Sequence, residues 1–157
     1  MNSVKLVILF LCCFQLNVSF GQQAFRIVGY FGINAAIENP GRNTFKRLTH
    51  INLWFLNPDS AGNFSRDLSK LKPFIANAHK KNIKVLFSIG GGSKQPQYHY
   101  LLKDDRRAGL VAMLVEEAVK YDVDGIDVDL EGSNIDDNYE KFVVVWTCGP
   151  LPRDPHA

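Results

Sequence analysis

The chain has 157 residues, of which 46% are hydrophobic and 22% are charged, and its formal net charge is +2. This length and composition are typical of one modest globular domain, and the sequence contains no internal repeat or low-complexity stretch. The near-neutral charge gives no electrostatic reason to expect nucleic acid or an acidic membrane surface as a partner.

The first 21 residues are organised like a secretory signal peptide. One positive charge in residues 1–5 precedes an apolar run at 6–14, and Ser19-Phe20-Gly21 offers small residues for cleavage after position 21. The apolar run is too short to be a convincing membrane span. We therefore expect a secreted, extracellular protein (periplasmic in a bacterium) with no membrane contact after cleavage. Only Cys148 then remains, which excludes an intramolecular disulfide.

Four strand-like segments alternate with helical segments along the rest of the chain. We predict strands at 25–31, 50–56, 83–89 and 126–130, because each segment is short, β-branched or aromatic, and followed by Gly, Asn or Pro. Apolar residues at helical spacing predict helices from about Ser69, over 106–120, and from Asp136 or Asp137 through Val143. This alternation predicts an α/β fold with a parallel sheet, whose strand C-termini carry the ligand site.

The fourth predicted strand carries an unusual set of acids. Side chains alternate along a strand, so Asp127, Asp129 and Glu131 share one face while apolar residues take the other. Carboxylates spaced about 6–7 Å apart repel one another once they are desolvated, so the arrangement indicates catalysis or a cation site. On spacing alone, a Mg²⁺ or Ca²⁺ site remains an alternative. Asp124 has the opposite parity, and we expect Asp124 and Gly125 to position the start of the strand.

The two most specific motifs resemble those of the family 18 glycoside hydrolases, the chitinases and endo-β-N-acetylglucosaminidases. Asp124, Asp127, Asp129 and Glu131 match the hallmark Asp-x-x-Asp-x-Asp-x-Glu, and Ser88-Ile89-Gly90-Gly91 matches the third-strand motif Ser-x-Gly-Gly. Weaker similarity appears at 28–31 and 49–52. With the upstream motif present, the resemblance favours catalysis over a metal site, and it implies no cofactor and no metal.

The resemblance implies the N-terminal half of a (β/α)₈ TIM barrel, with about four βα units in residues 22–146. Residues 147–157 form an unmatched tail rich in proline, and the chain looks like a truncated or frame-shifted product. We expect such a fragment to be inactive as written, because the opposite half of the barrel mouth would be missing.

The resemblance also implies a mechanism for hydrolysing β-1,4-linked N-acetylglucosamine polymers, or a related peptidoglycan or N-linked glycan. Glu131 would protonate the glycosidic oxygen, and the N-acetyl oxygen of the substrate would attack the anomeric carbon. Asp129 would orient the acetamido group, and Asp127 would share a proton with Asp129. This substrate-assisted retaining route differs from that of most glycosidases, which place two carboxylates across the bond.

Several other residues are candidates for contact with the sugar. Tyr30 and Phe31 could stack on sugar rings, although aromatic strand residues are more often part of a core. Ser88, Gly90 and Gly91 end the third strand, where the glycines predict either a flexible turn or a close approach of the backbone to sugar. The alternative function is a non-catalytic, chitin-binding relative on the same scaffold. Such relatives usually lose the last glutamate or the adjacent aspartate, and this chain retains both.

Overall fold

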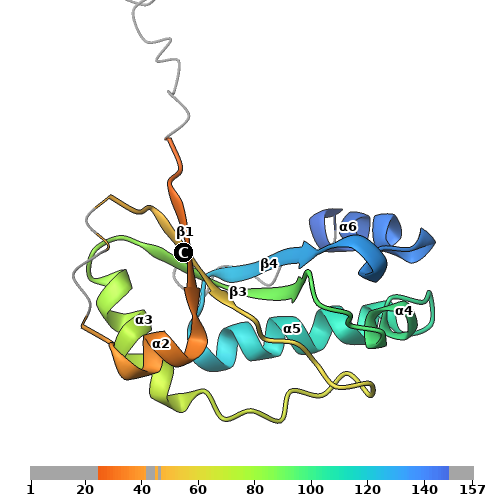
Figure 1. The fold of residues 1–157 in the computed structure, drawn as a ribbon, viewed down its shortest axis with the longest axis horizontal. Coiled ribbons are helices and arrows are strands. Elements are labelled where there is room, and N and C mark those ends of the chain that lie inside the picture. The colour runs from red at the N-terminus through yellow and green to blue at the C-terminus, as the bar shows by residue number, and fades with distance from the viewer. Residues whose placement is uncertain (1–24, 42–44, 46, 149–157) are drawn as a thin grey trace, which may run out of the picture.

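Four parallel strands, each followed by helical structure, make up the chain in a computed structural model that describes residues 25–41, 45 and 47–148 (Figure 1). The strands are β1 (Val28–Gly32), β2 (His50–Trp54), β3 (Lys84–Gly91) and β4 (Gly125–Leu130). They lie in one sheet in the order β1-β2-β3-β4, and every neighbouring pair is parallel. The predicted strands and the parallel α/β architecture are therefore confirmed. The predicted leader at 1–21 and residues 149–157 of the predicted tail lie outside the described residues.

Helices connect the strands and follow the last one. They are α2 (Ile33–Glu38), η3 (Ser69–Leu71) leading into α3 (Lys72–His79), α4 (Gln97–Leu101), α5 (Arg107–Tyr121), η4 (Gly132–Asn134) and α6 (Asp137–Cys148). The helices predicted from Ser69, over 106–120 and from Asp137 are confirmed, whereas α2, α4 and η4 were not predicted. Within the described part of the chain, no helix is long and apolar enough to cross a membrane.

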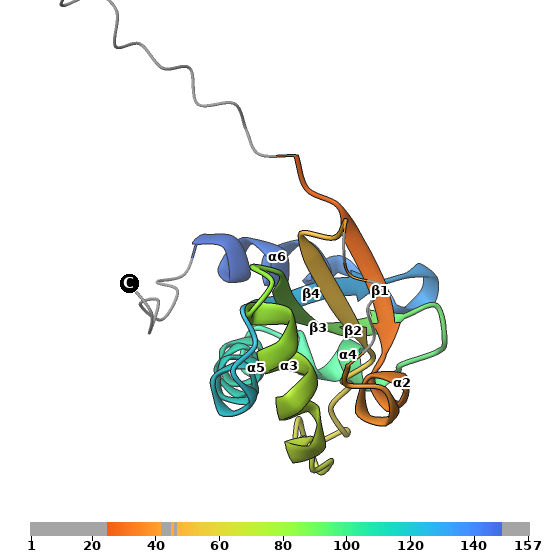
Figure 2. The ribbon, with the colours of Figure 1, turned by 90° about the vertical axis from the view of Figure 1, so that its left-hand side faces the viewer.

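The two faces of the sheet differ in chemistry. One face, the outer face, packs against α3 and α5, which lie together on one side of the sheet (Figures 1 and 2). Its side chains are apolar and almost fully buried: Ile51, Leu53, Val85, Phe87, Ile89, Ile126 and Leu130. The opposite face, the inner face, carries the side chains of the other parity, among them Tyr30, Asn52, Ser88, Asp127 and Asp129. Burial of the apolar face therefore fixes which residues line the inner face.

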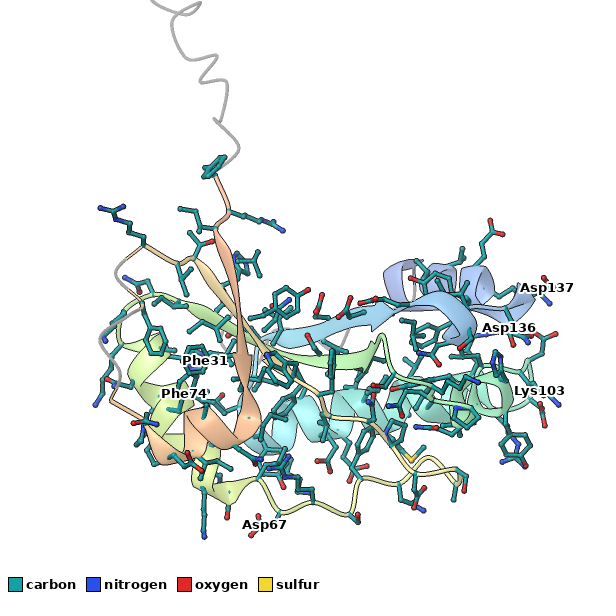
Figure 3. The ribbon with its side chains drawn as sticks, viewed as in Figure 1. Phe31, Asp67, Phe74, Lys103, Asp136 and Asp137 are labelled. Carbon is teal, nitrogen blue, oxygen red and sulfur yellow. The ribbon has the colours of Figure 1, made fainter. Side chains whose placement is uncertain are left out.

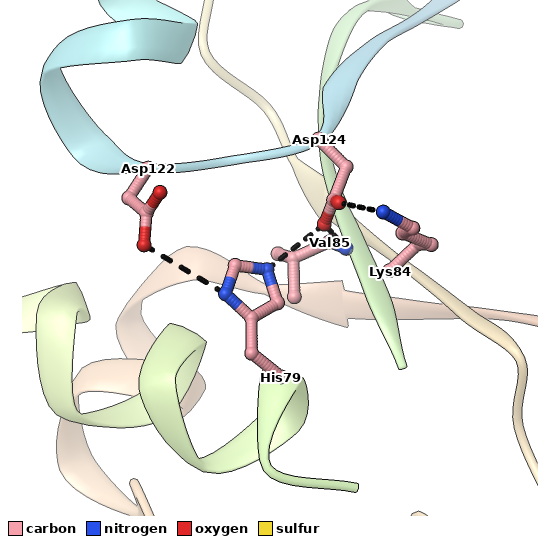
Figure 4. A network of polar contacts seen from close by, with 5 residues as sticks. All are labelled: His79, Lys84, Val85, Asp122 and Asp124. Atoms are coloured by element: carbon pink, nitrogen blue, oxygen red, sulfur yellow. Dashed lines mark hydrogen bonds and ion pairs between the residues drawn. The ribbon is translucent and has the colours of Figure 1, made fainter. Parts of the chain in front are cut away.

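A polar cluster closes the N-terminal end of β4, around Asp124 (Figure 4). One carboxylate oxygen of Asp124 accepts a hydrogen bond from the Val85 backbone N–H at 2.8 Å and lies 2.9 Å from His79 Nε2. The other oxygen accepts a hydrogen bond from Lys84 Nζ at 2.6 Å. Asp124 therefore joins the start of β4 to the start of β3 and to the end of α3. In parallel α/β folds this end of the sheet supports stability, while ligands bind at the opposite end.

These partners change the acidity of Asp124. Burial by itself raises the pKa of the carboxyl, but the hydrogen bonds from Lys84, Val85 and His79 outweigh burial and hold the pKa below its usual value. A depressed pKa in the folded state contributes stability above the unfolded pKa of about 3.9, and that stability is lost as pH falls through the folded value.

We expect Asp124→Asn to lower the free energy of unfolding at neutral pH by about 1.5–3 kcal/mol, the range for hydrogen bonds to charged groups. Stability of the variant should also fall less than that of the wild type when the pH is lowered from about 5 to about 3. Denaturant unfolding followed by circular dichroism at several pH values measures both effects. Asp122→Asn is the matched control. It also removes a carboxylate beside His79, at 3.7 Å, but the Asp122 side chain is 63% exposed, so both effects should be smaller. Equal unfolding free energies and pH slopes for Asp124→Asn and the wild type would contradict this role.

Candidate active site

Three carboxylates follow one another along the C-terminal half of β4, on the inner face. Asp127 lies opposite Ser88 of β3, and Asp129 lies opposite Gly90. Glu131 directly follows the strand with extended backbone angles (φ −129°, ψ 153°), so the alternation continues one residue past the last strand residue. The three acids therefore share one face and one end of the sheet.

Asp127 is held in place by two hydroxyl groups from neighbouring strands. Ser88 Oγ donates to Asp127 Oδ2 at 2.5 Å, and the Tyr30 hydroxyl donates to the same oxygen at 3.0 Å. Ser88 is fully buried, whereas Tyr30 is half exposed. Burial raises the pKa of the Tyr30 phenol; a contact with Asn52 opposes this shift, and the hydrogen bond to Asp127 adds to it. The phenol thus remains a donor. Tyr30, Ser88 and Asp127 form one hydrogen-bonded unit, whereas the sequence analysis placed Tyr30 and Ser88 among the sugar contacts and Asp127 among the catalytic acids.

Asp129 retains its proton to higher pH than an isolated aspartate. Burial is the largest cause of the raised pKa, followed by the negative charges of Glu131 and then of Asp127. Like charges along one strand disfavour the ionised form of the middle member. The acidic strand therefore brings three carboxyl groups together and raises the pKa of the middle one, an arrangement suited to general acid–base chemistry.

Gly90 lets β3 approach β4 beside Asp129. Its φ of +101° lies in a region that side chains rarely adopt, and a Cβ atom there would lie 2.6 Å from the Asp129 backbone oxygen. Asn57, in the loop after β2, forms two hydrogen bonds with the backbone of Gly90. Asn57 Nδ2 donates to the Gly90 oxygen at 3.0 Å, and the Gly90 N–H donates to Asn57 Oδ1 at 2.7 Å. Close packing against the acidic strand thus explains the glycine at this position.

The two glycines that follow leave room for neighbouring side chains. Gly91 has a φ of +87°, and a Cβ atom there would lie 2.5 Å from the ring of Phe55. A Cβ atom on Gly92 would lie 3.3 Å from Glu131 Oε2. The glycine run therefore ends directly beside the Glu131 carboxylate, and a larger residue at 92 would crowd that carboxylate. The run forms a tightly packed turn next to the acid.

Asn134 is a buried residue of the site that sequence reasoning missed. Its side chain is 2% exposed, and Nδ2 donates to the backbone oxygens of Gly91 and Ser93, both at 2.9 Å. Its Oδ1 accepts a hydrogen bond from the Gln95 N–H at 2.7 Å. Asn134 thus ties the turn after β3 to the segment after Glu131. The only sequence signal was an asparagine within a short Gly-Ser-Asn turn, which indicates no long-range partner.

The position of Phe31 differs from the sequence prediction that this residue contacts sugar. It lies one position after Tyr30, so it faces the outer side of the sheet and pairs with buried Leu53. Its ring packs against Phe45 at a centroid distance of 6.0 Å and against Phe74 of α3 at 5.9 Å; Figure 3 shows Phe31 and Phe74 side by side. The strand can offer only one of two successive aromatic residues to the inner face, and here that residue is Tyr30.

Asp124 and Gly125 lie at the opposite end of β4 from Glu131. Gly125 pairs with Leu86, and a Cβ atom there would meet the Leu86 side chain at an ordinary 3.7 Å.

Throughout residues 25–41, 45 and 47–148, no three His, Cys, Asp or Glu side chains are grouped as a metal site. The described chemistry of the inner face rests on the carboxylates, the Tyr30 and Ser88 hydroxyls and the backbone around them.

Comparisons with known proteins agree with this geometry. The family model of the glycosyl hydrolases of family 18 matches residues 26–147. A chitinase-like effector of Moniliophthora perniciosa is 29% identical over 111 residues, which are 67% of this chain and 25% of that protein. A chitinase-like effector of Moniliophthora roreri is 32% identical over 92 residues, which are 56% of this chain and 23% of that protein. The chain thus spans about a quarter of the length of these curated relatives.

Solved structures show the same fold. The family 18 chitinase ChiB of Flavobacterium johnsoniae superposes with a TM-score of 0.67 at 28% identity, over 76% of this chain and 40% of that one. A chitinase from Bacteroides thetaiotaomicron gives a TM-score of 0.61 at 26% identity, over 79% of this chain and 41% of that one. The sheet thus corresponds to part of a chitinase barrel. The chain belongs to the glycosyl hydrolases of family 18.

Proposed function

We propose that this chain forms the acidic side of the active site of a larger protein. That protein hydrolyses β-1,4-linked N-acetylglucosamine polymers such as chitin by substrate-assisted retaining catalysis. The observation that carries the proposal is the row Asp127, Asp129 and Glu131 at the C-terminal end of β4. Asp127 is fixed by two hydroxyls, and the pKa of Asp129 is raised between its acidic neighbours. The 28% identity to a chitinase of known structure supports the substrate class.

Each carboxylate has a separate role in this proposal. Glu131, beyond the strand end, donates a proton to the glycosidic oxygen and then accepts one from the attacking water. Asp129 accepts a hydrogen bond from the acetamido N–H, so that the acetamido oxygen faces the anomeric carbon. Asp127 shares a proton with Asp129 during the reaction. All three acids lie on one strand, so none of them can attack from the opposite side of the sugar, and in this proposal the acetamido oxygen of the substrate supplies the nucleophile.

Hydrolysis is proposed for a protein in which further strands complete the ring around this site. A (β/α)₈ barrel has eight strands, and this chain spans 40% of the Flavobacterium chitinase. The described sheet supplies the acid and the groups that orient the acetamido group. Contacts across the sugar, which position the bond and exclude water, would come from the strands opposite.

A non-catalytic, carbohydrate-binding function is the second candidate. It is favoured by the two curated relatives, which are described as chitinase-like effectors. The retention of Asp127, Asp129 and Glu131 in this chain favours the enzyme. Both candidates place an N-acetylglucosamine-containing polysaccharide on the inner face of the sheet.

We further propose that the protein acts outside the cell. The basic start, the apolar run at 6–14 and the small residues before position 22 support export with removal of residues 1–21. An extracellular location fits an insoluble polymer substrate, since such a polymer cannot enter the cell intact.

The enzymatic proposal is tested by completing the barrel. Residues 26–147 are joined to the remaining C-terminal strands of the Flavobacterium chitinase, and release of reducing ends from a chito-oligosaccharide is measured alongside its binding by calorimetry. We expect turnover that falls by about 10²–10⁴ in Glu131→Gln, because the general acid is lost. Binding of the oligosaccharide should persist, since the glutamine keeps the shape of the side chain.

The matched control for this experiment is Glu116→Gln, which removes an exposed carboxylate of α5 and should leave turnover unchanged. A chimera that binds the oligosaccharide but releases no reducing ends, with or without Glu131, would contradict the enzymatic proposal and favour the non-catalytic one. Unchanged turnover in Glu131→Gln would remove Glu131 from the role of acid.

The raised pKa of Asp129 predicts that this carboxylate costs stability. A group whose pKa is higher in the folded state contributes stability below its unfolded pKa of about 3.9, and that contribution is lost as pH rises through the folded value. We therefore expect Asp129→Asn to unfold at higher denaturant concentration than the wild type at neutral pH, with a flatter dependence on pH above about 4. Asp105→Asn, at an exposed position, is the control. A less stable Asp129→Asn protein would show that Asp129 is not under electrostatic strain.

A further inference from the structure

The loop after β2 contains a sequence pattern that the proposed activity does not use. Asn63-Phe64-Ser65 matches Asn-x-Ser/Thr, the acceptor pattern for N-linked glycosylation in secreted proteins. In the whole sequence, Asn17-Val18-Ser19 is the other match, and it lies within the predicted leader. After cleavage at position 21, residues 22–157 would therefore carry the pattern at Asn63 alone.

The pattern lies on a closed, ordered turn. The Asp59 N–H donates to the Asn63 oxygen at 3.0 Å, and the Gly62 N–H donates to the Asp59 oxygen at 3.0 Å. The Asp59 carboxylate accepts from the N–H groups of Ala61 and Asn63, both at 2.9 Å. The hydrogen bond from the Asn63 backbone is the largest cause that lowers the pKa of Asp59. The turn is thus organised by its own residues and does not depend on a modification for its shape.

The acceptor side chain lies at the surface, while its neighbours anchor the loop. Asn63 and Ser65 are exposed, and Phe64 between them packs against the core. Just before the pattern, a Cβ atom on Gly62 would lie 2.6 Å from Met113 Cε and 3.5 Å from Leu101, so this part of the loop rests on α5 and α4. A residue that carries a branched oligosaccharide has to face solvent in the folded protein, and Asn63 meets this requirement.

The loop lies on the helix side of the sheet, away from the acids. Figure 1 places it beneath α5 and α4, in agreement with the proximity of Gly62 to Met113 and Leu101. Asp127 and Asp129 face the opposite side. An oligosaccharide on Asn63 would therefore cover the outer surface of the helices and leave the inner face open.

We propose that Asn63 is an acceptor for N-linked glycosylation, which rests on the proposed passage of the chain through a secretory compartment. Asn63 Nδ2 attacks the anomeric carbon of the first sugar of a lipid-linked oligosaccharide diphosphate. The carbon–nitrogen bond forms, the bond from that carbon to the diphosphate oxygen breaks, and one amide proton passes to a base of the transferase. The amide keeps one N–H. The hydrogen bonds that Asp59 accepts from the backbone N–H groups of Ala61 and Asn63 do not involve the modified nitrogen, so the turn can persist after modification.

The test expresses the full 157-residue chain in a eukaryotic secretory host and compares the masses of the secreted protein before and after peptide N-glycosidase. We expect a glycan that the enzyme removes, with Asn63 converted to Asp in the peptide that contains it. Asn63→Gln and Ser65→Ala should each abolish the mass difference, and Ser65→Thr should retain it because threonine keeps the required hydroxyl. Asn17→Gln is the matched control and should leave the glycan in place.

Secreted protein with an unmodified Asn63 would overturn the proposal. A second arm delivers the same chain behind a leader of known function. A glycan on Asn63 in that arm, with no secreted protein when the native leader is used, would refute export by residues 1–21 and keep Asn63 as the acceptor. No glycan in either arm would overturn the acceptor assignment. Neither readout depends on sugar hydrolysis, so the outcome is independent of the proposed catalytic function.

Discussion

β4 carries apolar side chains on one face and carboxylates on the other, and the rest of the site depends on this constraint. Ile126, Val128 and Leu130 pack with the core on the helix side of the sheet. Because successive side chains of a strand take opposite faces, this packing forces Asp127 and Asp129 onto the inner face. Burial of the apolar residues therefore places three carboxyl groups side by side. Burial of Asp129, followed by the charges of Glu131 and Asp127, raises the pKa of Asp129.

The same strand separates stability from chemistry along its length. At its N-terminal end, Asp124 accepts hydrogen bonds from Lys84 and Val85, and the favourable contacts lower its pKa. At its C-terminal end, the pKa of Asp129 is raised by burial and by other acids. Two aspartates five residues apart thus have opposite shifts for opposite physical reasons. Polar contacts around the acids, such as those of Asn57 and Asn134 with the end of β3, fix the backbone against which the charged strand lies.

Sequence reasoning predicted those features that local patterns encode. The four strands, the longer helices and the face shared by the acids follow from periodicity and alternation. The prediction for Phe31 was wrong because strand parity, read one residue further along, places Tyr30 and not Phe31 on the inner face. The short helices α2 and α4 have six and five residues, too few for a clear helical period, and neither has a side-chain cap. Asn134 was missed because its partner Gly91 lies 43 residues away.

The central claim is that sugar binds at the C-terminal end of the inner face, beside Asp129 and Glu131. The most direct test is an NMR titration of the completed barrel, with residues 26–147 ¹⁵N-labelled, with a β-1,4-linked N-acetylglucosamine oligomer. We predict amide shift changes at Gly90 and Gly91 and from Asp129 to Gly132, with none at Lys84 or Asp124, which lie at the other end of the sheet. Changes confined to the Asp124 end, or no changes at saturating sugar, would contradict the account.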